Sequence, residues 1–403
     1  MRLKKKYRNL LRFIAVTLIL ILMISVVAAA KQHIDNKKSN HNQDIEEEYP
    51  DEDAEAYELP ERTLNSDVIP YDGVPRTISC WGDSMMFGMG AGEAYIVFGD
   101  DEPFDISGWT SPDTLQYLTG IKVYNLGVSG ETSYEIALRQ GGIKMYVRDT
   151  FEVGYDDSVD VTIVDENGGE VYMADFSAYG YTEPQESDIV YINDEMFKIT
   201  GTEEEGLHIC RYSDEEVNYD AFTTVYADTQ VYTKASYERK NDILILEIGS
   251  NGGWENYRQL INQYDAMIQN SGCDYYIIVG DTDDPGTSIA DTTQGIRNED
   301  GTYIGVGDTA WEATLREAYG DHFINMRTYL IENGLTDVGL RPTVGDYKGF
   351  RRGRISKQLR YDWTHFNSYG YYSKGIAIYA KGVELGYWAV SYTHLTLPTK
   401  LEV

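Results

Sequence analysis

Cysteine and positive charge are both scarce in this sequence. Three cysteines, Cys80, Cys210 and Cys273, occur among 403 residues, and none lies close to another. This spacing excludes a disulfide framework and a cysteine-ligated metal site, and we expect no bound metal and no cofactor. Lys and Arg number 34 against 66 Asp and Glu, a net charge of -32. Such an acidic surface repels phosphate backbones, so nucleic acid is not an expected partner.

Long apolar runs are missing from most of the chain, and the main exception is near the N-terminus. Residues 1–12 carry six positive charges and precede 18 uncharged, mostly apolar residues at 13–30. We interpret 1–12 as a cytoplasmic basic segment and 13–30 as a transmembrane helix or signal anchor. The chain is then a single-pass protein of the cell membrane with an extracellular C-terminal domain. The alternative is secretion after cleavage near Ala30.

The rest of the chain changes in composition several times. A polar, acidic stretch is followed by short apolar runs that alternate with helical spacing, and β-type runs without helices interrupt this alternation. Alternating strands and helices predict an α/β fold with a parallel sheet covered on both faces. The predicted parts are a disordered acidic linker (31–68), the α/β domain in two pieces (69–148 and 239–389) and an inserted all-β domain (149–238).

The last residues, 390–403, follow what reads as the final helix. The string SYTHLTLPTKLEV resembles translated sequencing-adapter sequence. We therefore interpret it as a non-native tail, with a natural β-like extension as the alternative.

Small polar motifs follow the predicted strands and precede the last predicted helix. They are GDS at 82–84, NLGVSGETS at 125–133, IGSNGGW at 248–254 and DWTHFN at 362–367. The carboxyl ends of parallel strands meet at one edge of a sheet, so these motifs are expected to converge there. Each motif alone is weak evidence, because strand-end turns and helix caps use the same residues.

Together the motifs contain the parts of an acyl-transfer site. Ser84 is the candidate nucleophile, His365 the base that takes its proton, and Asp362 the group that holds the imidazole. The backbone N–H groups of Gly130 and Ser84 and the amide of Asn251 are candidate donors to the oxyanion. An α/β-hydrolase is excluded because the serine does not lie in a G-x-S-x-G elbow.

These four motifs resemble the four blocks of the SGNH (GDSL-type) hydrolase family over roughly 76–147 and 241–389. The family's nucleophile block falls on Gly82-Asp83-Ser84, its glycine on Gly130, its asparagine on Asn251, and its aspartate and histidine on Asp362 and His365. The resemblance implies a flavodoxin-like three-layer α/β/α sandwich and hydrolysis of esters or thioesters. Gly252 departs from the family pattern, which has aspartate there, and Met85 stands where leucine is common. The β-insert resembles family versions with a β-module before the third block.

The expected function is that of an extracytoplasmic serine esterase. It would remove short acyl groups, chiefly O-acetyl, from a small ester or an acylated carbohydrate such as a cell-wall polymer. A lipase, lysophospholipase or thioesterase is one alternative, and a surface protein that binds a glycan or a partner through the β-insert is another. The basic stretch 339–360, with Arg351, Arg352 and Arg354, is either a solvated loop or a lid that favours an anionic polymer.

Overall fold

The computed structural model describes residues 62–388, except 65, 98–101, 155–156, 174–175, 177–187, 213–221, 286 and 288–307. The predicted basic segment, the membrane helix and the tail lie outside the described residues, as does the linker up to residue 61. No helix within the described part combines the length and apolarity needed to cross a bilayer.

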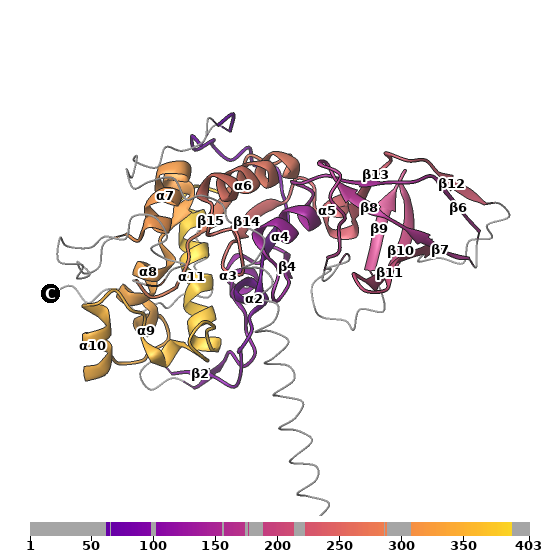
Figure 1. The fold of residues 1–403 in the computed structure, drawn as a ribbon. Coiled ribbons are helices and arrows are strands. Elements are labelled where there is room, and N and C mark those ends of the chain that lie inside the picture. Colours follow the sequence, from indigo (N-terminus) through magenta and orange to yellow (C-terminus); the bar gives the residue numbers. More distant parts are fainter. Residues whose placement is uncertain are drawn as a thin grey trace, which may run out of the picture. The chain divides into compact units, whose positions relative to one another are not determined.

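A five-stranded parallel sheet forms the centre of the α/β domain (Figure 1). Its strands, in spatial order, are β4 (Val123–Gly127), β1 (Ile78–Gly82), β14 (Ile243–Glu247), β15 (Tyr276–Val279) and β16 (Phe323–Ile324). Numbered along the chain, this order is 2-1-3-4-5, one of the two common doubly wound arrangements. Ligands of such sheets bind where the strand order reverses, which is here between the carboxyl ends of β1 and β14.

Helices cover both faces of this sheet. One face packs against α3 (Ser111–Thr119), α8 (Met326–Glu332), α9 (Gly334–Asp337) and α11 (Ser368–Glu384). The other face packs against α4 (Ser133–Gln140), α6 (Tyr257–Ser271) and α7 (Ala310–Tyr319). Strand residues are buried on both faces, which explains why these strands are almost continuously apolar.

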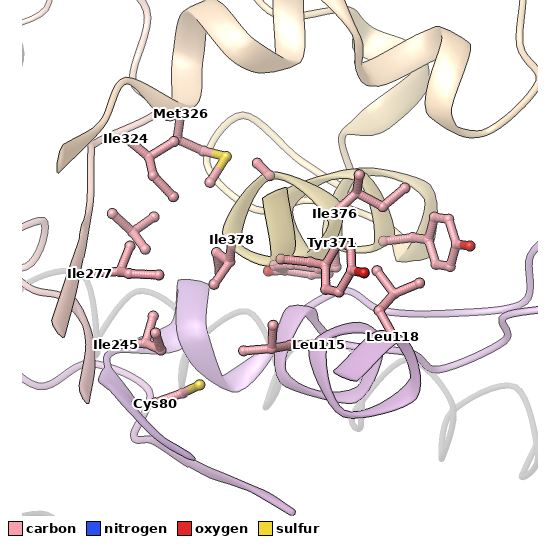
Figure 2. Close-up of a cluster of buried hydrophobic side chains, with 14 of the residues drawn as sticks. Cys80, Leu115, Leu118, Ile245, Ile277, Ile324, Met326, Tyr371, Ile376 and Ile378 are labelled. Carbon is pink, nitrogen blue, oxygen red and sulfur yellow. The ribbon is translucent and has the colours of Figure 1, made fainter. Parts of the chain in front are cut away.

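Side chains from neighbouring strands and from two helices form the core on the α11 side. Cys80, Ile245 and Ile277 point toward this face from three neighbouring strands, and Figure 2 shows them opposite Leu115 of α3 and Ile378 of α11. All five side chains are fully buried. Cys80 is therefore a packing residue, and burial raises the pKa of its thiol.

Local sequence sets where several helices begin. Thr110, Thr132, Thr309 and Thr343 each form a capping box with an acidic residue three positions later. The threonine side chain accepts a hydrogen bond from a free N–H of the first turn, while the acidic side chain accepts one from the threonine N–H.

The antiparallel part lies between β5 and α5. Its main sheet has seven strands in the order β7-β11-β10-β9-β13-β5-β8. Its edge strands, β7 and β8, are separated in the chain by Thr162 alone, so the sheet curls until its edges approach. The bounds are β5 (Met145–Val147), β7 (Ser158–Val161), β8 (Ile163–Asp165), β9 (Asp188–Ile192), β10 (Glu195–Thr202), β11 (Gly206–Arg211), β13 (Gln230–Thr233) and α5 (Lys234–Glu238).

Short elements complete the described fold. Two small antiparallel pairs occur, β6 (Phe151–Val153) with β12 (Thr223–Val225) and β2 (Tyr95–Ile96) with β3 (Phe104–Asp105). The remaining helical elements are α2 (Ser84–Phe87), α10 (Val344–Phe350) and the 3-10 turns η1 (Gly320–His322) and η2 (Lys357–Leu359).

Two predicted boundaries differ from the structure. β5 starts at Met145, before the predicted boundary at 149, because it pairs with both β13 and β8 of the antiparallel sheet. The predicted linker extends to 68, but Arg62 is already packed. Its guanidinium pairs with Asp265 at 2.7 Å and lies 4.6 Å from the ring centre of Tyr319, so this cation anchors the chain before the first strand.

Candidate active site

The turn after β1 presents Ser84 at the carboxyl edge of the sheet. Asp83 caps the short helix α2, and its side chain accepts a hydrogen bond of 2.9 Å from the N–H of Met85. Gly82 has no room for a side chain, since a Cβ there would lie 2.6 Å from the carbonyl oxygen of Glu247. Gly88 ends the helix at φ +93°, a conformation that favours glycine. Ser84 is thereby the first residue of a helix that the sequence confines to one turn.

His365 lies opposite Ser84 on the loop that leads into α11. Its Nε2 is 2.9 Å from Ser84 Oγ, and its Nδ1 is 2.8 Å from Asp362 Oδ2. The second oxygen of Asp362 accepts the N–H groups of Thr364 at 2.8 Å and of His365 at 2.6 Å. The two carboxylate oxygens thus have separate tasks: one fixes the loop backbone and the other the imidazole.

The surroundings of Asp362 keep its carboxylate ionised. Burial opposes ionisation, but the hydrogen bonds from the His365 ring and from two backbone N–H groups outweigh it and lower the pKa of Asp362 to about 2. An ionised carboxylate at Nδ1 favours the tautomer whose Nε2 faces Ser84 as an acceptor. The geometry therefore equips Ser84 with a base and that base with an orienting group.

A pocket of about 310 Å³ opens beside Ser84. The structure brings Gly130, Asn251 and His365 to its lining, together with Met89 and Trp363. Among the described residues, the backbone N–H groups of Ser84 and Gly130 donate no hydrogen bond. Both residues line the pocket, so their N–H groups are candidate donors to an oxyanion.

The Asn251 amide is engaged with its neighbours. Its Nδ2 lies 3.2 Å from Asp83 Oδ2 and 3.2 Å from the carbonyl oxygen of Glu131. It thus links the turns that follow β1, β4 and β14, and it must release one of these bonds to donate to an oxyanion. Gly252, the departure from the SGNH pattern, has φ +150°, and a Cβ there would lie 3.0 Å from Thr132, so an aspartate would be strained.

Buried charges lie beneath the site. Asp83 is 1% exposed, and burial raises the pKa of its carboxyl, although hydrogen bonds from Ser250 and the Met85 N–H oppose this shift. Lys374 of α11 is fully buried and donates to Glu247 Oε2 and, at 3.2 Å, to the carbonyl oxygen of Met85. This ammonium therefore holds the turn that carries Ser84, the candidate nucleophile.

A second buried ion pair supports the Gly130 loop. Glu131 and Arg139 are both fully buried, with Arg139 Nη2 at 2.6 Å and Nε at 2.9 Å from Glu131 Oε2. The guanidinium also lies 5.1 Å from the ring centre of Trp81 in β1. This pair fixes the residue directly after Gly130.

Sequence reasoning missed Arg360, which holds the histidine loop. Its guanidinium donates to the carbonyl oxygens of Thr282 at 2.8 Å, Thr364 at 3.1 Å and Trp363 at 3.3 Å. Its side chain is 10% exposed. The sequence does place a basic residue two positions before Asp362, but several other Lys and Arg residues in the same stretch made it impossible to single out.

Trp363 and Asp283 were also missed. Trp363 lies between the aspartate and the histidine and is 82% exposed beside the pocket. Asp283 follows β15 and lines the same pocket. Burial raises the pKa of Asp283, while the nearby Arg360 charge opposes the shift.

The three predicted arginines do not line the pocket beside Ser84. Arg352 and Arg354 line a separate, larger groove on the other side of Trp363, and Arg351 belongs to neither lining. Within the described ranges, no group of three or more histidine, cysteine and acidic side chains is arranged to hold a metal ion.

Comparison of the chain with protein-family models, with curated proteins and with solved structures found no match in any of the three.

Proposed function

We propose that this protein is a serine esterase of the SGNH type that hydrolyses short acyl esters, chiefly O-acetyl groups on a carbohydrate. The observation that carries the proposal is the continuous hydrogen-bonded chain from Ser84 Oγ through His365 to Asp362, with distances of 2.9 and 2.8 Å. Its position after β1, at the reversal of strand order, is where doubly wound sheets bind ligands.

The reaction follows from these contacts. Ser84 Oγ attacks the ester carbonyl carbon while His365 Nε2 takes the hydroxyl proton, and the carbonyl oxygen becomes an oxyanion. The N–H groups of Ser84 and Gly130 donate to that oxyanion. The C–O bond then breaks, and the alcohol leaves with the proton from His365. Water, deprotonated by the same imidazole, hydrolyses the acyl-enzyme and restores Ser84.

The pocket size supports a short acyl group. Its volume of about 310 Å³ is at the lower end of the range for small-molecule sites, roughly 300–1,000 Å³. Of the apolar residues that follow Ser84, Met85 and Met86 are buried in the core and only Met89 lines the pocket. This arrangement argues against a long lipid chain.

The predicted export segment and the predicted membrane location extend the proposal. A tethered enzyme with its catalytic domain outside the cell would meet wall or surface carbohydrates, and its N-terminal helix would be its contact with the membrane.

The test is hydrolysis of p-nitrophenyl acetate, butyrate and octanoate by the full chain and by its Ser84→Ala variant. Acetate should be the best substrate, and Ser84→Ala should lower kcat at least about 10³-fold, since triad members act as a unit. A fluorophosphonate probe should also label Ser84, as located by mass spectrometry. Equal activity of the two proteins would refute the proposal, and a preference for octanoate would favour the lipase alternative.

A further inference from the structure

A groove of about 840 Å³ runs beside the catalytic pocket. It is lined by α10, by the segment that follows it and by the loop that carries Asp362. Trp363 lines both the groove and the pocket beside Ser84. A molecule bound in the groove could therefore extend past Trp363 and reach Ser84.

The groove is positively charged on a strongly acidic chain. Five Lys and Arg side chains line it, against three aspartates. The aspartates are engaged: Asp362 holds His365, Asp284 lies 3.5 Å from Arg354, and Asp346 accepts the Ser356 hydroxyl at 2.7 Å.

Three of the groove's cations remain available. Lys348, Arg352 and Lys357 are exposed, and none of them forms an ion pair with any other residue that the structure describes. With the overall charge at -32, a local cluster of free cations indicates an anionic ligand.

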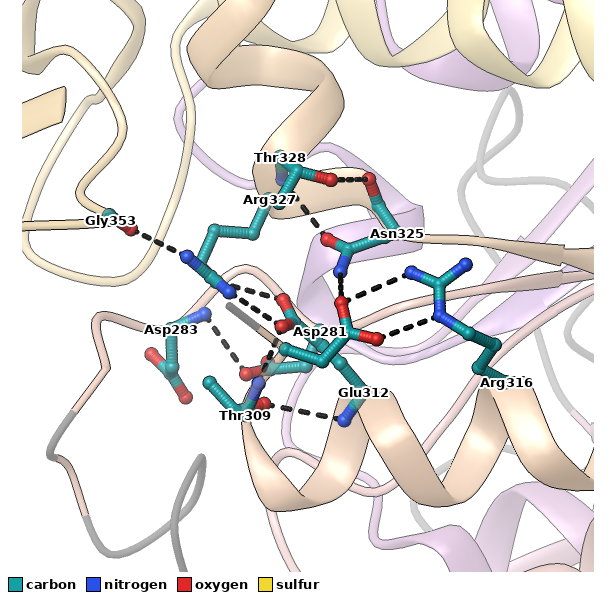
Figure 3. Close-up of polar contacts among 10 residues, drawn as sticks. Asp281, Asp283, Thr309, Glu312, Arg316, Asn325, Arg327, Thr328 and Gly353 are labelled. Carbon is teal, nitrogen blue, oxygen red and sulfur yellow. Dashed lines mark hydrogen bonds and ion pairs between the residues drawn. The ribbon is translucent and has the colours of Figure 1, made fainter. Parts of the chain in front are cut away.

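The turn that carries Arg352 has a buried support, which Figure 3 shows in part. Arg327 is fully buried; its Nε and Nη2 pair with Glu312 at 2.8 and 2.5 Å, and its Nη1 donates to the carbonyl oxygen of Gly353 at 2.9 Å. Gly353, at φ +70°, separates Arg352 from Arg354. A buried ion pair thus fixes the turn that carries both arginines, so less entropy is lost when a ligand binds.

Two aromatic residues line the groove, and one of them, Trp363, also lines the pocket. Trp363 is 82% exposed and Tyr361 is 65% exposed. Exposed aromatic side chains offer flat apolar faces beside polar groups. The C–H face of a sugar ring fits such a surface, whereas its hydroxyls and acidic groups can turn to the cations.

We propose that this groove binds an acidic polysaccharide that carries the ester. The polymer's negative groups would bind Lys348, Arg352 and Lys357, and a sugar ring would pack on Trp363 with its acyl group at Ser84. This inference rests on the proposed esterase function and names its substrate class.

The first experiment compares two acetylated polymers, anionic polygalacturonate and neutral xylan. The full chain is tested against a triple variant, Lys348→Gln with Arg352→Gln and Lys357→Gln. The ratio of kcat/KM on polygalacturonate to that on xylan should fall about tenfold, mainly through KM, because exposed charge pairs are individually weak. Added salt should lower the same ratio in the unmodified protein.

The matched control replaces three exposed cations outside the groove, Lys122→Gln, Lys144→Gln and Arg258→Gln. It changes the net charge equally and should leave the ratio unchanged. An equal fall in both triple variants, or no fall in the groove variant, would overturn the proposal.

A binding experiment separates this proposal from the esterase function. The full chain with Ser84→Ala is titrated with deacetylated polygalacturonate and with polyglutamate, and the heat of binding is followed by isothermal titration calorimetry. Polygalacturonate should bind more tightly, and Trp363→Ala should weaken that binding by about tenfold, the upper part of the range for an aromatic contact. This result would stand even if no ester were hydrolysed. Equal binding of polyglutamate would overturn the sugar recognition.

Discussion

Replacing Arg360 tests whether its hydrogen bonds to backbone carbonyl oxygens position the loop that carries His365. Arg360→Met keeps an unbranched apolar stem but removes the donors to the carbonyl oxygens of Thr282, Trp363 and Thr364, at 2.8, 3.3 and 3.1 Å. Two of these carbonyls belong to the residues directly before His365. Without the guanidinium, His365 keeps its contacts with Asp362 and the hydrogen bond of 2.9 Å that its carbonyl oxygen accepts from the N–H of Tyr361.

The size of the effect follows from these contacts. Three hydrogen bonds from a charged donor, partly replaced by water, correspond to a loss of about 2–4 kcal/mol in the free energy of unfolding. A displacement of the imidazole by about 1 Å should lower kcat about 10²-fold. KM for a small ester should change less than about twofold, because uniform binding is not lost.

The assay is steady-state hydrolysis of p-nitrophenyl acetate, with urea denaturation to confirm that the variant is folded. Arg341→Met is the matched control, since Arg341 is exposed and lies outside the pocket and the groove. Arg360→Lys should recover part of kcat, because an ammonium can reach one of the carbonyls. A folded Arg360→Met protein with unchanged kcat would refute the positioning role.

Two further substitutions test the buried charges. Asp242 is 6% exposed, and burial raises its pKa to about 6. The folded state therefore binds a proton that the unfolded state has lost, and stability falls as the pH rises from about 4 to about 6, by about 3 kcal/mol in total. Urea denaturation below and above this pH range should show no such fall in the free energy of unfolding of Asp242→Asn. If the variant kept the pH dependence of the unmodified protein, Asp242 would not be its source. Lys374→Met leaves Glu247 buried without its partner and should lower the free energy of unfolding by about 3–5 kcal/mol. Adding Glu247→Gln should restore most of this stability. If the double variant showed no recovery, the ammonium would act through other contacts.

Local sequence patterns were sufficient for the main elements of the α/β domain. The apolar runs at 242–250 and 275–281 contain β14 and β15, and the helical spacing at 255–270 coincides with α6 to within two residues. A strand buried on both faces must be apolar throughout, and this is visible without any tertiary information. β16 was not predicted, because a strand of two residues leaves no period to detect.

The candidate site depends more strongly on the tertiary structure. The sequence alone named Ser84, Asp362 and His365, because small polar residues at strand ends are uncommon in this combination. It could not supply the 2.9 Å contact between Ser84 and His365, which are 281 positions apart, or show that Arg352 lines a separate groove and not the pocket.

The roles of the residues that support the site are determined only by the tertiary structure. Lys374 contacts Met85, which is 289 positions away in the sequence, Arg139 pairs with a buried glutamate, and Arg360 is hidden among similar basic residues. From sequence alone, a basic side chain is expected to be solvated at the surface. It is buried only when the fold brings a carbonyl or carboxylate oxygen to it, and the sequence does not show this. The candidate nucleophile is therefore recognisable from local sequence, whereas its alignment with the candidate base arises from long-range packing.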